Sequence, residues 1–164
     1  MRIKRRANAA LFQIIDPDDQ IVAGSWALTG SPRWLDLLHA VKALRVVPLL
    51  GQLVPPVDLL VPLVGRRTYV AVTRRRMIFI QLSWPRNMPG QAVLDVPVSV
   101  VRISGGRRGV TLDSVRYSGP GEIDLGISTP RQWRSDFEEV LTALRAGGAS
   151  VEVSGSRRDA FGPA

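Results

Sequence analysis

Alternating apolar and polar positions along the chain predict several β-strands. Residues 21–28 form the first apolar run, which ends in a Thr-Gly-Ser-Pro turn at residues 29–32. The runs at residues 67–73 and 76–82 are apolar at both odd and even positions, which is typical of a sheet covered on both faces. Further strands are expected at residues 92–104, 110–118 and 122–128. We therefore expect a mainly β (α+β) fold with about six to seven antiparallel strands.

A three-to-four-residue period marks the C-terminal part of the chain. Apolar residues recur at this spacing over residues 133–144, directly after Thr129 and Pro130, which both favour a helix start. A glycine pair then ends the pattern. The sequence predicts an α-helix that closes the sheet, followed by a flexible tail at residues 147–164.

A long apolar insertion separates the first two predicted strands, at residues 33–65. Its first part has one polar stripe on an apolar helix, and residues 46–64 form a 19-residue apolar segment. That length approaches the roughly 20 residues of a membrane-spanning helix, but four prolines, Gln52 and Asp58 argue against a span. Three interpretations stay open: a buried linker, a loop at a bilayer interface, or a self-association surface.

The 164 residues are expected to form one domain with two extensions. Residues 1–9 form a basic N-terminal segment, residues 10–146 the domain with its insertion, and the tail follows. The N-terminus is similar to the start of a signal peptide, but the next apolar run is short and leads into Asp-Pro-Asp-Asp at residues 16–19. We expect no secretion signal, and the absence of cysteine is compatible with a cytoplasmic location.

The net charge of +8 arises in one part of the chain. Residues 65–117 contain ten arginines and two aspartates, whereas the charges of the remaining residues cancel. A basic surface attracts anionic lipid or nucleic acid through its long-range field. Arginine also far outnumbers lysine, which is typical of GC-rich codon usage and of incidental arginines. Both interpretations of the charge stay open.

Catalytic chemistry is sparse in this sequence. His39 is the single histidine, no nucleophile elbow occurs, and the acid pairs fall in turns or on a helix face. The Gly-rich loop at residues 105–109 lacks the Lys and Ser/Thr of a P-loop. Tyr69 and Phe79, which could stack on bases, lie in apolar runs expected to be core. We expect no enzyme, cofactor or metal site, and nucleic acid is the least supported partner.

Two short motifs accompany this order of elements. Residues 72–78 read apolar-Thr-x-x-Arg-apolar, and residues 96–101 read Val-Pro-x-x-x-Val. Together with the closing helix they resemble bacterial pleckstrin-homology-like (PH-like) and GRAM-like domains over roughly residues 10–145. The resemblance implies a β-barrel or sandwich without catalytic apparatus. Arg74 departs from the family turn, which often has Asp or Asn, and only Arg66 and Arg67 match the family's lipid-binding pattern.

The leading hypothesis is a non-catalytic PH-like module that associates peripherally with the anionic inner membrane surface. The apolar insertion would enter the interface while arginines contact headgroups. The candidate lipid-binding residues are Arg33, Arg66, Arg67, Arg74, Arg75, Arg76, Arg107 and Arg108. The candidate membrane or partner contacts are Trp34, Leu49, Leu50, Leu53, Val54, Leu59 and Leu60. The alternative is a protein-interaction or self-association module, including a homo-oligomer, with no lipid role.

Overall fold

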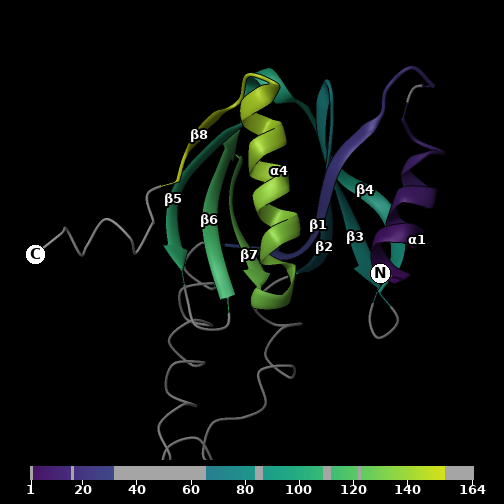
Figure 1. Ribbon diagram of the computed structural model, residues 1–164, viewed down its shortest axis with the longest axis horizontal. Coiled ribbons are helices and arrows are strands. Elements are labelled where there is room, and N and C mark those ends of the chain that lie inside the picture. Colours follow the sequence, from purple (N-terminus) through teal and green to yellow (C-terminus); the bar gives the residue numbers. More distant parts are fainter. Residues whose placement is uncertain are drawn as a thin grey trace, which may run out of the picture.

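A computed structural model describes residues 2–15, 17–31, 66–83, 87–108, 112–121 and 123–153. Within these ranges the chain forms one eight-stranded sheet and two α-helices (Figure 1). The helices are α1 (Arg2–Leu11) and α4 (Arg134–Ala146), with short 3-10 helices η1 (Val98–Val100) and η2 (Arg131–Trp133). The strands are β1 (Ile21–Gly30), β2 (Arg66–Thr73), β3 (Arg76–Ser83), β4 (Met88–Pro97), β5 (Arg102–Arg108), β6 (Leu112–Gly119), β7 (Ile123–Pro130) and β8 (Ser150–Glu152).

The sheet consists of two antiparallel meanders joined at β1. Its strand order is β4-β3-β2-β1-β7-β6-β5-β8, and β1 pairs with β2 along most of its length but with β7 only through residues 28–30. β1 ends at Gly30 and β2 begins at Arg66, so the insertion lies between the first two strands as predicted. The mainly β fold with a C-terminal helix is confirmed.

The eighth strand corrects the predicted count of six to seven and the predicted tail. β8 lies within residues 147–164, which were expected to be flexible, and it pairs parallel to β5. Gly148 has a φ of +90°, a conformation that glycine adopts at little cost, and it turns the chain from α4 toward β5. Ser150 N–H then donates to the Val101 carbonyl at 3.1 Å, which begins the pairing.

The inner face of the sheet packs against α4. Phe137, Val140, Leu141 and Leu144 are buried and recur at helical spacing, as the sequence predicted. The sheet contributes alternate residues from both meanders, including Phe79 of β3 and Tyr117 of β6. Their rings meet edge to face with centroids 5.5 Å apart, so aromatic packing joins the two halves.

The outer face of β1–β3 packs against α1. Ala7, Leu11 and Ile15 form an apolar stripe at four-residue spacing on the buried side chains Tyr69, Ala71, Ile78, Ile80 and Leu82. Tyr69 donates a hydrogen bond to Asn8 Oδ1 at 3.2 Å. The prediction that these strands are covered on both faces is therefore confirmed. The cover is a helix in the segment that the sequence analysis described only as basic.

Candidate functional site

The predicted lipid-binding arginines do not form one group. Arg66 and Arg67 begin β2, whereas Arg74, Arg75 and Arg76 lie at and beyond its other end. A strand of eight residues extends for roughly 25 Å, so β2 separates the two sets by most of the height of the sheet. We call the region around Arg66 and Arg67 the insertion-bearing end of the sheet. We call the region around Arg74, Arg75 and Arg76 the opposite end.

The β2–β3 turn, at the opposite end, is organised by Thr73. The Thr73 hydroxyl accepts hydrogen bonds from the backbone N–H groups of Arg75 and Arg76 at 3.2 and 2.9 Å. It also donates to the Arg76 carbonyl at 3.2 Å. These bonds account for a threonine at the start of a tight turn. The Thr-x-x-Arg motif therefore has a structural role in this chain.

Arg76 interacts with two acidic side chains at the opposite end. Its Nη1 donates to Asp95 Oδ2 at 3.2 Å, and its Nε lies 3.9 Å from Asp19 Oδ2. The Asp19 carboxylate is buried and has no hydrogen-bond partner among the described residues. A buried carboxylate without hydrogen bonds needs a nearby positive charge. Arg76 therefore acts as a counter-ion inside the fold.

Strand register places Arg66 and the β5–β6 hairpin near one another along the sheet. Arg66 pairs with Thr29, and Thr29 pairs with Ile127 on β7. Arg108 pairs with Asp113, which pairs with Thr129, two residues farther along β7. The end of β5, the start of β6 and the start of α4 lie together at the lower end of the molecule in Figure 1. The backbones of Arg107 and Arg108 thus belong to the insertion-bearing end.

α1 brings further basic residues to this end, which the sequence analysis did not assign to the site. Arg67 Nη1 donates to Asn87 Oδ1 at 3.4 Å, and Arg6 Nη1 lies 3.6 Å from Sδ of the adjacent Met88. The run Lys4-Arg5-Arg6 was visible in the sequence, but its position was not. The helical spacing of Ala7, Leu11 and Ile15 was the available signal that it docks on the sheet.

The start of α4 is tied to the sheet by an ion pair at this same end. Arg134 donates through Nη2 to Asp113 Oδ1 at 2.8 Å and through Nε to Asp113 Oδ2. This two-pronged hydrogen bond raises the pKa of Arg134. The positive charge of Arg134 balances the negative charge of Asp113, so Asp113 lowers the electrostatic potential of this end only slightly.

Charge composition differs sharply between the two ends. At the insertion-bearing end the described acids are Asp113, Asp136, Glu138 and Glu139. The basic residues there with described side chains are Lys4, Arg5, Arg6, Arg66, Arg67, Arg131 and Arg134, and the backbones of Arg2, Arg107 and Arg108 lie at this end as well. The basic residues at the opposite end are Arg74, Arg75, Arg76, Arg102, Arg116 and Arg145, and its acids are Asp18, Asp19, Asp95, Asp124 and Glu152. The insertion-bearing end is therefore strongly cationic, and the opposite end is nearly balanced.

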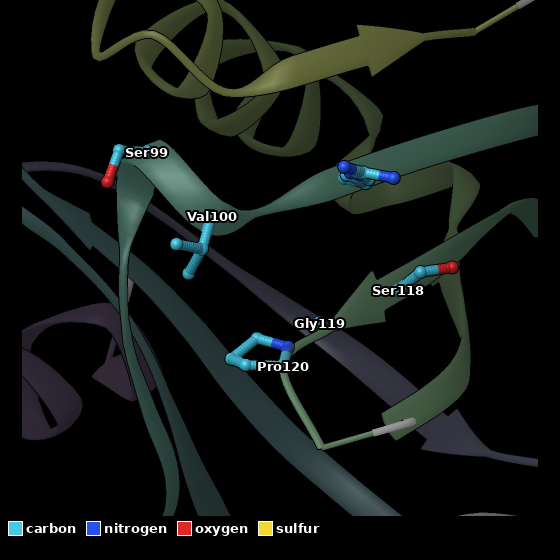
Figure 2. Close-up of a pocket in the computed structure, with 6 residues that line it drawn as sticks. Ser99, Val100, Ser118, Gly119 and Pro120 are labelled. Atoms are coloured by element: carbon cyan, nitrogen blue, oxygen red, sulfur yellow. The ribbon is translucent and has the colours of Figure 1, made fainter.

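A pocket of about 380 Å³ lies at the opposite end, between η1 and the β6–β7 turn (Figure 2). Figure 2 shows Val100 and Pro120 facing one another across it, while Ser118 directs its hydroxyl away from both. Arg102 is the cation among the residues that line it. A specific ligand site needs several polar groups that converge, and this pocket does not supply them.

The remaining predicted contacts lie outside the described residues. They are Arg33, Trp34, Leu49, Leu50, Leu53, Val54, Leu59 and Leu60. In the described part of the chain, no helix has the length and apolar content needed to cross a membrane. The same residues contain no group of three or more His, Cys, Asp or Glu that could hold a metal ion.

Comparisons with known proteins give a similarity of fold. No protein-family model matches this chain, and no curated protein matches it. Among solved structures, the hSac2 domain from the human phosphoinositide phosphatase Sac2 is similar, with a TM-score of 0.50 and 8% sequence identity. The match covers 98% of this chain and 92% of that domain. At this identity the comparison concerns the fold and transfers no function.

Proposed function

We propose that this chain is a non-catalytic, PH-like module that binds anionic membrane surfaces through its insertion-bearing end. The observation that carries the proposal is the uneven distribution of charge between two ends of one sheet. Random placement of incidental arginines would leave both ends similarly matched by acids. Here the excess lies at the end from which the apolar insertion emerges.

The fold supports a PH-like assignment. Two antiparallel meanders share β1, and a C-terminal helix packs on the inner face of the sheet. The similar human domain comes from a phosphoinositide phosphatase, a protein named for a lipid substrate. A shared fold allows many functions, so this similarity bears on the fold and not on the partner.

The proposed binding combines electrostatic attraction with apolar contact. Each basic residue near an anionic membrane contributes about 1 kcal/mol, and the attraction declines over a Debye length of roughly 10 Å. Arg66 is exposed and Arg67 half-buried at the root of the insertion. The proposal assigns the apolar contact to the insertion at residues 33–65. Electrostatic recruitment would then hold that segment against the bilayer.

Co-sedimentation with lipid vesicles tests the proposed function. The full chain is mixed with neutral phosphatidylcholine vesicles and with vesicles containing phosphatidylglycerol, across a salt series. We expect binding to the anionic vesicles that weakens as salt rises. Equal binding to both vesicle types would contradict the electrostatic component, and no binding to either would contradict the function itself.

Self-association is the second candidate, and the free edge of β4 favours it. Among the described strands β4 has a neighbour on one side only, and its Met88 and Val93 side chains are 45% and 51% exposed. Two register shifts against β3, together with Pro89 and Pro97, make this edge irregular, which opposes strand addition. Light scattering over a concentration series separates the candidates, because self-association predicts a rising mass without lipid.

A further inference from the structure

The first turns of α1 hold charges that are not needed to fix the helix. Lys4 Nζ lies 2.9 Å from Asp136 Oδ1 and 3.9 Å from Glu139 Oε2, so one cation is matched by two acids of α4. The apolar stripe of α1 holds the other side of the helix on the sheet. Arg5 and Arg6 are both exposed and serve neither attachment. Their charge is therefore available to a partner.

Arg6 and Arg67 lie beside adjacent residues of one turn. Arg67 contacts Asn87, and Arg6 contacts Met88, although the two arginines are far apart in the sequence. The β3–β4 turn thus joins the start of α1 to the root of the insertion. Basic side chains of α1 and β2 therefore lie against neighbouring residues, Met88 and Asn87.

The segments that form this surface contain no acidic residue, and the nearby acids Asp136 and Glu139 of α4 lie against Lys4. The described residues 2–15, 66–69, 80–83 and 87–91 contain neither Asp nor Glu. Met88 adds an exposed apolar side chain between the arginines. Exposed arginines around an apolar side chain suit the interface of a bilayer, where headgroups meet acyl chains. A bilayer is favoured because the exposed side chains Phe12, Ile14 and Met88 of these segments are apolar and can enter the boundary between headgroups and acyl chains.

We propose that Arg5, Arg6 and Met88 extend the lipid-binding surface, so that α1 contacts the anionic bilayer together with the root of the insertion. The inference rests on the proposed function and deepens it. It adds a second contact region to the one formed by Arg66 and Arg67. It also assigns α1 two functions: the helix covers the outer face of the sheet and presents cations to the membrane.

The test compares variants of the full chain on phosphatidylglycerol-containing vesicles. R5E/R6E should weaken binding at least about tenfold, since each basic group near the surface contributes roughly fivefold. R5K/R6K should retain binding, because it keeps the charge. Circular dichroism and thermal unfolding establish that each variant is folded. A further variant, M88S, should weaken binding to a smaller extent and leave its salt dependence unchanged.

Two failures can be told apart in this experiment. If the unmodified chain does not bind anionic vesicles, the proposed function is wrong. If R66E/R67E abolishes binding while folded R5E/R6E binds like the unmodified chain, the function stands and the inference is wrong. Binding of an oligonucleotide at the same salt, lost in R5E/R6E while vesicles remain unbound, would assign the surface to nucleic acid and overturn the inference.

Discussion

Arginine has different roles at the two ends of this sheet. At the opposite end, Arg76 lies between Asp19 and Asp95, and Arg116 pairs with Asp124. At the insertion-bearing end, basic residues outnumber acids among the described residues, and Arg5 and Arg66 are exposed. The comparison shows that the acids around an arginine decide its role. Those acids come from distant parts of the chain, so the fold must be known before the role can be assigned.

The largest expected effect of a single substitution is on stability, at Arg76. R76A removes the positive charge nearest the buried Asp19 carboxylate. Breaking a buried pair costs about 3–5 kcal/mol, and the partial exposure of Arg76 lowers our expectation to about 2 kcal/mol. Urea unfolding measures the loss, with R74A as the matched control. Equal stability of the two variants would show that Arg76 has no internal role.

A smaller loss is expected at Lys4, which joins α1 to α4. K4A removes a partly exposed ion pair with Asp136, and such pairs contribute about 0–1 kcal/mol. Hydrogen exchange of the α1 amides should become faster, while the exchange of α4 amides such as Leu141 and Leu144 stays the same. Unchanged protection of α1 would mean that the apolar stripe alone holds the helix.

The pair at Arg116 gives a prediction about pH. The hydrogen bond from Arg116 lowers the pKa of Asp124 below its ordinary value. The small stabilisation from this exposed pair is therefore present above that ordinary value and is lost as the pH falls through the lowered pKa. NMR titration of Asp124 should show the lowered pKa, and R116A should return it to the ordinary range. An unshifted pKa in the unmodified protein would remove the pair from this account.

The smallest effect on vesicle binding should follow from adding positive charge at the opposite end. D18K/E152K raises the net charge by four, but it does so at the opposite end. We expect vesicle affinity to change by less than about threefold, because a charge more than a Debye length from the membrane is screened. A gain as large as the loss expected from R5E/R6E would show that net charge, and not its placement, controls binding.

Much of the fold could be predicted from hydrophobic periodicity. The paired strands at residues 67–73 and 76–82 match β2 and β3, and the helix predicted after Pro130 matches α4. β8 was missed because a three-residue edge strand has too little periodicity to detect. α1 was not predicted because its apolar stripe is narrow. The basic residues within the same segment resemble the start of a signal peptide.

The site could be predicted only in part. Arg66 and Arg67 were identified at the root of the insertion, and their position follows directly from strand order. The sequence analysis placed Arg74, Arg75 and Arg76 in the same group as Arg66 and Arg67. The two sets are close in the sequence, but the length of β2 separates them in space. Asp19, which lies next to the Arg76 guanidinium, belongs to a turn that is far from Arg76 in the sequence. Long-range pairing of this kind has no local signal.

The most direct test of the central claim compares vesicle binding by two double variants. R66E/R67E and R74E/R75E change the net charge equally, but they do so at opposite ends of β2. The account predicts at least about a tenfold loss of affinity for R66E/R67E and less than about a threefold change for R74E/R75E. Thermal unfolding establishes that both variants remain folded. Equal losses, or a larger loss for R74E/R75E, would contradict the claim that the insertion-bearing end faces the membrane.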